Sequence, residues 1–210
     1  SGTRVYDGTV NFTAGAFTVT AITGTLGVDA LTIASGAGTV PSANVAANQT
    51  LTSGNLALGA TVGLASNYTL VGGTHTGTIT TRSVNLSGTR VYDATVNFSA
   101  AILTITGTVL GQTLTLSGGP GTVPSANVAT NQTLTVTALA LVSGTGLASN
   151  YTLVGGTHTG TITAGAIVVN LAGTRVYDGT LNFTAGAFTA TITGTVGGET
   201  LTIASGTGTV

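Results

Sequence analysis

The chain has 210 residues, only 4% of them charged, and a formal net charge of −1 at pH 7. Its four basic residues are all arginines and no apolar run is long enough to cross a bilayer, which argues against nucleic acid and membrane as partners. The absence of cysteine excludes disulfide bonds, and the five acidic residues are too few and too scattered for a rod stiffened by calcium.

One unit of about 85 residues is written more than twice along the chain. Its first marker is GTRVYDGT at residues 2–9, which returns at 88–95 with alanine for the second glycine and at 173–180 unchanged. A second marker, LASNYTLVGGTHTGTIT, is identical at 64–80 and 147–163. These markers divide the chain into repeat 1 (1–81, N-terminally incomplete), repeat 2 (82–164) and repeat 3 (165–210, C-terminally truncated), which we expect to be a window on a longer array.

Within a unit, apolar and hydroxyl residues alternate with the period of a β-strand. Residues 9–20 predict two strands about a short Ala-Gly turn, residues 132–142 predict a strand with one apolar face, and residues 150–163 predict two strands joined at Gly155-Gly156. No window has the spacing and caps of a helix. About seven short strands per unit predict an all-β chain of tandem small domains, each an Ig-like two-sheet sandwich.

Two further features bear on the packing of the units. Tyr68 and Tyr151 each follow a small turn and precede a leucine by two residues, which is the pattern of a tyrosine corner, although a plain strand tyrosine fits equally well. No Pro-rich or Gly/Ser-rich linker separates residues 77–81 from residues 84–93. The sequence therefore predicts a stiff string of domains rather than beads on a flexible chain.

No constellation of residues predicts catalysis, metal binding or a cofactor. His75 and His158 occupy one equivalent position, but a single histidine between threonines has no Cys or carboxylate cluster to complete a metal site. A nucleophile elbow is missing, as is a phosphate-binding loop with lysine. We therefore expect a protein that is not an enzyme.

The charged residues gather in the repeated motif, which holds six of the nine formal charges: Arg4 and Asp7, Arg90 and Asp93, Arg175 and Asp178. An Asp-Gly turn can fold the aspartate back toward the arginine. We hypothesise a structural joint in which each pair forms a clasp, directly or across the joint. The accompanying tyrosine would pack against the last strand of the preceding unit; these tyrosines are Tyr6, Tyr92 and Tyr177. The alternative is a ligand site that displays tyrosine and arginine as anchors.

The ordered motifs RVYDGT, SANVATNQTLTVTALALVSG and LASNYTLVGGTHTGTIT resemble the YDG repeat family over essentially the whole chain. Domains of that family occur in tandem in very large secreted bacterial surface proteins, including filamentous-haemagglutinin-like adhesins. The resemblance implies an extracellular or cell-surface stalk or fibre, and it makes a β-grasp-like domain the alternative to the sandwich.

These observations lead to an expected function. The chain is expected to be a structural repeat segment of a secreted bacterial surface protein, with other copies of the repeat as its partners and with filament assembly as a stronger form. The alternative is an adhesive module that binds glycan or a host protein.

Overall fold

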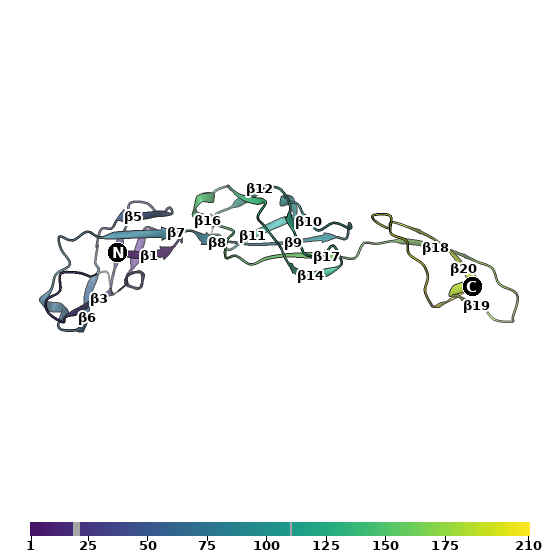
Figure 1. The fold of residues 1–210 in the computed structure, drawn as a ribbon, viewed down its shortest axis with the longest axis horizontal. Coiled ribbons are helices and arrows are strands. Elements are labelled where there is room, and N and C mark those ends of the chain that lie inside the picture. The colour runs from purple at the N-terminus through teal and green to yellow at the C-terminus, as the bar shows by residue number, and fades with distance from the viewer. Residues whose placement is uncertain (19–21, 110) are drawn as a thin grey trace. The chain divides into compact units, whose positions relative to one another are not determined.

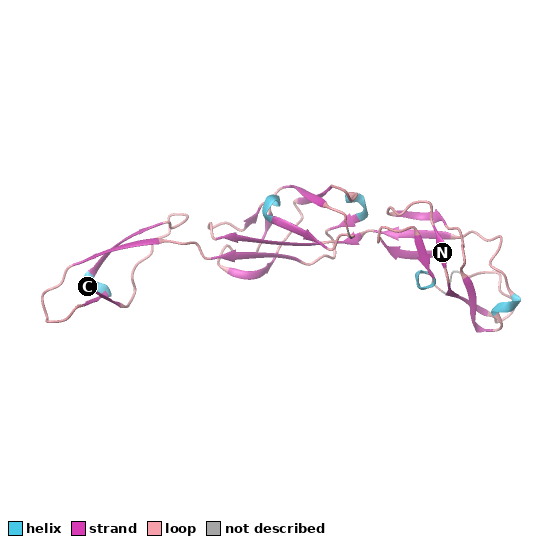
Figure 2. Cartoon of the chain, turned by 180° about the vertical axis from the view of Figure 1, so that it is seen from behind, coloured by secondary structure: helices cyan, strands magenta, loops and turns pink. Residues whose placement is uncertain are grey.

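The computed structural model describes residues 1–18, 22–109 and 111–210, and its strands and loops are shown in Figures 1 and 2. The described residues form short strands in several small sheets, with single 3-10 turns and no α-helix. The prediction of an all-β chain built from tandem small β domains is confirmed. None of the described helical turns has the length or apolar character needed to span a bilayer.

The strands follow the repeats along the sequence. Repeat 1 contains β1 (Gly2–Val5), β2 (Asn11–Thr13), β3 (Ala30–Ser35), β4 (Ala37–Thr39), β5 (Ala46–Thr50), β6 (Ala57–Val62) and β7 (Thr76–Thr80). Repeat 2 contains β8 (Arg82–Ser83), β9 (Asn85–Val91), β10 (Asn97–Phe98), β11 (Leu103–Thr106), β12 (Leu114–Gly118), β13 (Gly121–Thr122), β14 (Ala129–Thr133), β15 (Leu139–Ser143), β16 (Tyr151–Thr152) and β17 (His158–Thr163). Repeat 3 contains β18 (Val168–Gly173), β19 (Asn182–Thr184), β20 (Phe188–Thr193) and β21 (Thr207–Thr209).

The five 3-10 turns among the described residues fall at two kinds of position. Three of them follow β2, β10 and β19: η1 (Ala14–Ala16), η4 (Ala100–Ile102) and η6 (Ala185–Ala187). The other two precede the second-marker tyrosines: η3 (Ala65–Asn67) and η5 (Ala148–Asn150).

The first and last strands of repeat 1 pair in parallel. β1 lies beside β7 with Arg4 opposite Ile79, and β5 pairs antiparallel on the other edge of β7. Because parallel strands end at the same edge of a sheet, the residues after β1 lie where β7 leaves the repeat, and the backbone N–H of Tyr6 donates to the Thr80 carbonyl at 2.9 Å. The motif therefore stands at the exit of its own repeat.

Residues 9–20 do not form the predicted hairpin. In the described residues β2 pairs antiparallel with β4, with Phe12 opposite Gly38, and Phe17 after η1 forms a bridge with Gly2. Gly15 lacks the positive φ that a two-residue hairpin turn of type I′ requires, so the chain leaves the sheet instead of folding back. Residues 19 and 20 of this prediction lie outside the described residues.

The segments 132–142 and 150–163 each contribute strands to two different sheets. Within residues 132–142 the alternation runs through the end of β14 and the start of β15, but β14 pairs with β17 whereas β15 pairs with β12. Within residues 150–163 the two predicted strands exist as β16 and β17, and they join different sheets. An alternating pattern identifies the buried face of a strand but not its neighbour.

By their contacts the residues separate into two compact units. Unit 1 comprises Ser1–Leu86, Ile105–Ser117 and Ala140–Thr157, and unit 2 comprises Ser87–Thr104, Gly118–Leu139 and His158–Val210. One buried cluster of unit 1 takes residues from both repeats: Tyr6, Phe12, Val40, Leu51, Ile79, Val84, Leu114 and Tyr151. In unit 2, Phe98 and Ile162 are almost completely buried. Parts of repeat 2 thus share a core with repeat 1.

Candidate functional site: the joint between repeats

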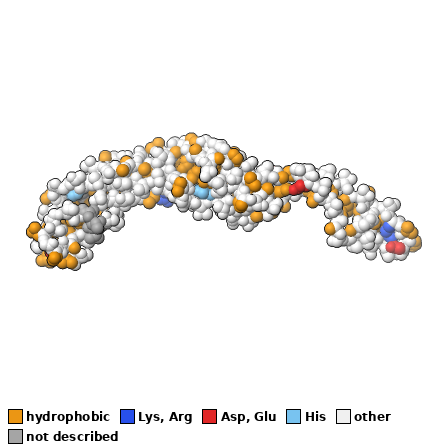
Figure 3. Space-filling model, in the orientation of Figure 1, with side chains coloured by type: hydrophobic (Ala, Val, Ile, Leu, Met, Phe, Trp, Pro, Cys, Tyr) orange, Lys and Arg blue, Asp and Glu red, His pale blue; other side chains and the backbone are white. Residues whose placement is uncertain are grey.

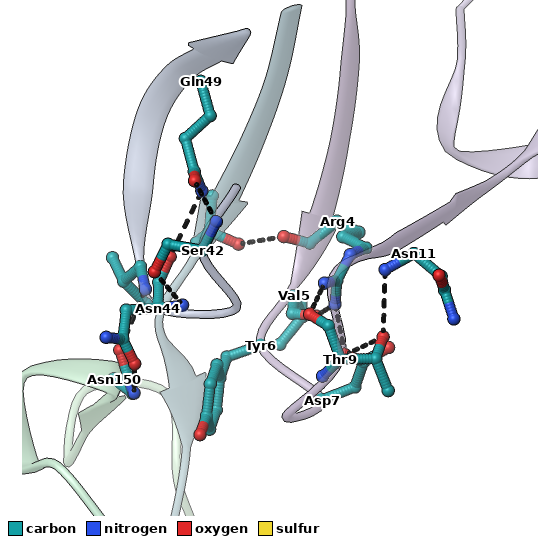
Figure 4. Close-up of polar contacts among 12 residues, drawn as sticks. Arg4, Val5, Tyr6, Asp7, Thr9, Asn11, Ser42, Asn44, Gln49 and Asn150 are labelled. Carbon is teal, nitrogen blue, oxygen red and sulfur yellow. Dashed lines mark hydrogen bonds and ion pairs between the residues drawn. The ribbon is translucent and has the colours of Figure 1, made fainter. Parts of the chain in front are cut away.

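The arginine and aspartate of the motif pair directly within each repeat (Figure 4). In repeat 1, Nη1 of Arg4 donates to Oδ1 of Asp7, and Nη2 donates to the carbonyl of Thr9. The backbone N–H and the hydroxyl of Thr9 both donate to the same Asp7 oxygen at 2.9 Å. The arrangement recurs in repeats 2 and 3. The clasp therefore closes a loop inside the motif and does not cross the joint.

Packing and backbone geometry explain why the loop closes. Gly8 has a φ of +81°, a conformation that costs glycine little, and the chain turns back there so that Thr9 reaches Asp7. The Arg4 guanidinium lies 4.9 Å from the centroid of the Phe12 ring, a cation–π contact, and its side chain is only 11% exposed. The Arg4 guanidinium thus packs against the Phe12 ring and is hydrogen-bonded by Asp7 and Thr9 of the turn.

Hydrogen bonding sets the acidity of the clasp carboxylates. The hydroxyl and then the backbone N–H of Thr95 lower the pKa of Asp93, with Arg90 adding to the effect. In repeat 3 the backbone N–H of Thr180 is the largest cause that lowers the pKa of Asp178, to about 2. Each donor stabilises the ionised carboxylate. The carboxylates of Asp93 and Asp178 are therefore ionised at neutral pH.

Tyr6 contacts the repeat that follows its own, opposite to the predicted direction. Its ring meets the edge of the Tyr151 ring at a centroid distance of 5.3 Å and an interplanar angle of 80°. Its hydroxyl accepts a hydrogen bond from Nε2 of Gln112 at 2.7 Å, and the Tyr151 hydroxyl donates to Oε1 of the same side chain at 2.6 Å. The direction is reversed because the parallel pairing of β1 with β7 carries the motif to the exit of the repeat.

A buried asparagine forms a second contact between repeats 1 and 2 (Figure 4). Asn150 of repeat 2 is 1% exposed; its Oδ1 accepts from the backbone N–H of Val45 at 2.8 Å, and its Nδ2 donates to Oδ1 of Asn44 at 2.9 Å. Gln49 holds this loop of repeat 1 by accepting from the Ser42 N–H and donating to the Asn44 carbonyl. The Asn150 side chain therefore binds one backbone group and one side chain in the loop of the neighbouring repeat.

The segment that joins repeats 1 and 2 is itself a strand. β8 pairs in parallel with β16 of repeat 2, and the N–H of the following residue, Val84, donates to the Thr152 carbonyl at 3.0 Å. Val84 is fully buried, and Arg82 donates through Nε to the Gly107 carbonyl at 2.6 Å. Backbone hydrogen bonding therefore continues through residues 82–84, which limits bending at this joint.

The three motif tyrosines differ in burial. Tyr6 is 4% exposed and Tyr177 is 89% exposed, while Tyr92 is half-buried. Tyr92 donates its hydroxyl to a carboxylate oxygen of Glu199 in repeat 3, which raises the pKa of that tyrosine. Tyr6 and Tyr92 each contact the repeat that follows their own.

The predicted tyrosine corners are not formed. A corner needs the hydroxyl to bond to backbone a few residues upstream, but the Tyr68 hydroxyl accepts from the distant N–H of Leu26 at 3.0 Å and donates to Oδ2 of Asp29 at 2.8 Å. The Tyr151 hydroxyl accepts from the N–H of Val109 at 3.0 Å in the same way. These tyrosines fix a loop of their own repeat rather than a sandwich corner.

The histidines take part in the sheets through their backbone. The carbonyls of His75 and His158 accept from Leu51 and Leu134, each at 2.9 Å. His75 also lines a cavity of about 130 Å³ in repeat 1, together with Phe17, Leu51 and Leu70. In the described part of the chain, no three His, Asp or Glu side chains gather as a metal site would require.

The fold and the joint define a class: a tandem all-β repeat protein in which one repeat continues the core of the next. A family model described as YDG domain matches residues 1–78 and again residues 74–161. The chain therefore belongs to the YDG domain family and contains two tandem copies of that domain. Searches among curated proteins and among solved structures gave no match.

The sequence pattern did not predict that three residues, Gln112, Asn150 and Val84, belong to the joint. Gln112 corresponds to Asp29 and Glu199 in the other repeats and resembles an ordinary polar surface position. Asn150 belongs to an Asn-x-Thr triplet of a kind common in this threonine-rich chain, and Val84 is one valine among many. The exact recurrence of the LASNY segment, which contains Asn150, was the one sequence feature that pointed to a structural role for it.

Proposed function

We propose that this chain is a structural repeat segment, serving as a stalk, spacer or fibre in a secreted bacterial surface protein. The observation that carries the proposal is the buried cluster in which Tyr6 of repeat 1 packs with Val84, Leu114 and Tyr151 of repeat 2. A core that continues across a joint resists bending there, which is what a stalk needs. The segment has no catalytic role in this proposal.

The proposed location is extracellular or at the cell surface. It is supported by the YDG family match, by the likeness of the motifs to those of large surface adhesins, and by a surface on which charged side chains are sparse (Figure 3). A surface of threonine, serine and asparagine repels other copies only weakly. Copies of the same repeat are the proposed partners, and assembly into extracellular filaments is the stronger form of the proposal.

A distance measurement across the joint tests the stalk. Because the chain has no cysteine, the variant carrying Thr61→Cys and Ser117→Cys accepts two spin labels in unit 1, one on each repeat. We expect a narrow distance distribution, broadened by Tyr6→Ala and unchanged by the matched control Tyr177→Ala. A label pair at positions 3 and 61, both in repeat 1, reports any loss of folding. A broad distribution in the chain without Tyr6→Ala would contradict the proposal.

The second candidate is an adhesive module, favoured by the cavity beside His75. Its lining mixes apolar side chains with hydroxyls and one imidazole, which suits a small polar ligand such as a sugar. A glycan screen on the whole chain tests this candidate, with His75→Ala expected to abolish a hit and His158→Ala expected to preserve it. A screen without any hit rejects the adhesive reading of the cavity.

A further inference from the structure

The segment by which the chain enters repeat 2 pairs with the segment by which it leaves. β8 lies beside β16, with Arg82 opposite Tyr151, and the Val84 N–H donates to the Thr152 carbonyl at 3.0 Å. Next along the chain, β9 lies beside β17, the last strand of the repeat. The entry segment 82–92 is therefore hydrogen-bonded to the exit segment 151–163 in two successive stretches.

The entry and exit segments run parallel to each other. In the first stretch the pairing of β8 with β16 is parallel. In the second stretch the Leu86 N–H donates to the Thr157 carbonyl at 3.3 Å. Six residues further on in both segments, the Tyr92 N–H donates to the Thr163 carbonyl at 2.8 Å. Donor and acceptor advance together, as they do in parallel strands, and in repeat 1 the pairing of β1 with β7 is parallel as well.

The direction of pairing determines how the repeat responds to tension along the chain. In a parallel pair, the N-terminal end of one strand and the C-terminal end of the other lie at opposite ends of the pair. Tension that enters at residue 82 and leaves at residue 163 therefore pulls β9 lengthwise along β17 and strains their hydrogen bonds together. Strands that are pulled from the same end of a pair are instead peeled apart one bond after another.

A threonine hydroxyl adds to the pairing at the end of each exit strand. The Thr163 hydroxyl donates to the Arg90 carbonyl of β9 at 3.2 Å. In repeat 1 the Thr80 hydroxyl donates to the Arg4 carbonyl of β1 at the same distance. Each exit strand is thus bonded to its entry strand by a side chain as well as by the backbone.

The clasp fixes the far end of the entry strand. Arg90 belongs to β9, and its guanidinium lies 5.0 Å from the centroid of the Phe98 ring and donates to the Thr95 carbonyl. Tension draws β9 toward its N-terminal end, away from the loop that the clasp closes. The guanidinium opposes this movement, because it is bonded to that loop and packs on a fully buried ring.

Tension passes from repeat 1 to repeat 2 with little intervening chain. β7 ends at Thr80 and β8 begins at Arg82, so Thr81 alone separates the exit strand of repeat 1 from the entry strand of repeat 2. Both strands are paired in parallel inside their own repeats. A pull along the chain therefore reaches one parallel pairing directly after the other.

We propose that the repeat is a clamp that bears tension along the chain, and that the parallel pairing of the entry segment with the exit segment resists the pull. The proposal rests on the stalk function above and gives that stalk a mechanical role, which is to keep its length when its two ends are pulled apart. The pairing within repeat 2 carries the proposal, because the chain both enters and leaves that repeat.

Pulling repeat 2 in two directions tests the clamp. Because the chain has no cysteine, the handles of an optical trap can be attached to the whole chain at introduced cysteines. Thr81→Cys with Ala164→Cys pulls the paired segments lengthwise, whereas Val91→Cys with Ala164→Cys pulls apart the C-terminal ends of β9 and β17. A Cβ built on Gly165 would lie 3.8 Å from Cγ1 of Val91, so these ends lie together. The three replaced side chains are exposed.

We expect the lengthwise pull to need roughly twice the unfolding force of the other pull, or more, at one loading rate, because several bonds must break together. Equal forces in the two directions would overturn the proposal. That result would leave the stalk function standing, because the spin-label distance reports stiffness at the joint in a chain without applied force.

Two Thr→Val substitutions in β17 separate resistance to tension from stability. Thr163→Val removes the hydroxyl bonded to β9. The matched control Thr161→Val removes a hydroxyl that accepts from the Asn131 N–H of β14 at 3.1 Å, on the other edge of β17.

At a fixed force on handles at 81 and 164, Thr163→Val should speed unfolding roughly threefold or more, and Thr161→Val should keep the rate within about twofold. Circular dichroism should show both variants folded. A Thr161→Val variant that unfolds under tension as fast as Thr163→Val would contradict the clamp.

Discussion

The chain has two joints, one between repeats 1 and 2 and one between repeats 2 and 3. Both contain nearly the same motif, but the segments that link the repeats differ. The first joint is the short strand β8 followed by fully buried Val84, whereas the second has two more residues, a loop at 164–167, and Val169 in place of Val84 at 36% exposed. Tyr6 is packed on Tyr151, while the Tyr92 hydroxyl donates to the Glu199 carboxylate.

At the first joint the contacts come from the LASNY segment of repeat 2. Repeat 2 offers Asn150 and Tyr151 to repeat 1, and the counterpart of Val45 in repeat 2, Val128, is 55% exposed. The clasp is identical at both joints. The clasp therefore shapes the motif, and at the joint between repeats 1 and 2 the LASNY segment of repeat 2 packs against that motif.

The largest expected effect comes from replacing the motif tyrosines one at a time. Tyr6→Ala removes a buried ring and the acceptor for Nε2 of Gln112, which should cost about 3–5 kcal/mol in the free energy of unfolding. Tyr92→Ala should cost about 1 kcal/mol, and Tyr177→Ala should change stability by no more than about 0.5 kcal/mol. Urea unfolding followed by circular dichroism measures all three. Equal costs would mean that the tyrosines act inside their own repeats.

The buried amide should have the next largest effect. Asn150→Ala leaves the Val45 N–H and the Asn44 side chain without their partner, at a cost of about 1–3 kcal/mol. The matched control is Asn67→Ala, because Asn67 holds the same place in repeat 1 and is exposed. Thermal unfolding of the two variants gives the comparison. A cost for Asn67→Ala as large as that for Asn150→Ala would assign the effect to the local turn instead.

The motif turn gives a smaller effect with a defined sign. Gly8→Ala forces a Cβ toward Val109 and places alanine at positive φ, which should cost about 1 kcal/mol. The reverse change Ala94→Gly relieves a φ of +63° in repeat 2, where the built Cβ of Gly197 lies 3.4 Å from the Ala94 Cβ. Chemical denaturation should find Ala94→Gly neutral or slightly stabilising. A stabilising Gly8→Ala would mean that repeat 2 does not press on the turn.

The clasp should give the smallest effect of the four. A double-mutant cycle of Arg90→Ala and Asp93→Ala should yield a coupling of about 0.5–1 kcal/mol, because the arginine is 9% exposed while the aspartate is half exposed. The same cycle on Arg175 and Asp178 should show coupling too, since that clasp needs no following repeat. Zero coupling in both repeats would mean that the arginine–aspartate pair does not stabilise the motif.

Acid supplies an independent check on the clasp. The pKa of Asp178 falls from 3.8 to about 2 on folding. A carboxyl whose pKa is lower in the folded state stabilises that state above its unfolded pKa, and the contribution disappears as the pH falls through the folded value. Unfolding midpoints should therefore drop between about pH 4 and pH 2, and less so in Asp178→Asn. An identical acid response in that variant would contradict the assignment.

The sequence predicted the parts of this structure that depend on local chemistry. The alternation of apolar and hydroxyl residues predicted the β class, the repeats predicted the domain spacing, and the Asp-Gly turn led to the hypothesis that Arg4 pairs with Asp7. Each of these needs only residues close in the chain, or a period that can be counted.

What could not be predicted depends on which strands become neighbours. Parallel pairing of β1 with β7 joins residues more than seventy positions apart and decides that Tyr6 faces the next repeat. Asn150 offers the same amide whether it caps a turn, carries a glycan or binds a loop, and only the burial beside Val45 distinguishes these roles. Gln112 varies among the repeats, so its place between two tyrosines left no pattern to read.

The claim that repeats 1 and 2 share one core is tested most directly by a double-mutant cycle between Tyr6→Leu and Tyr151→Leu. Leucine keeps an apolar side chain at each site and removes the contact between the rings. The account predicts a coupling of about 0.5–1.5 kcal/mol in the free energy of unfolding, typical of edge-to-face aromatic pairs. Two costs that add without coupling would contradict it, because the tyrosines would then stabilise two separate domains.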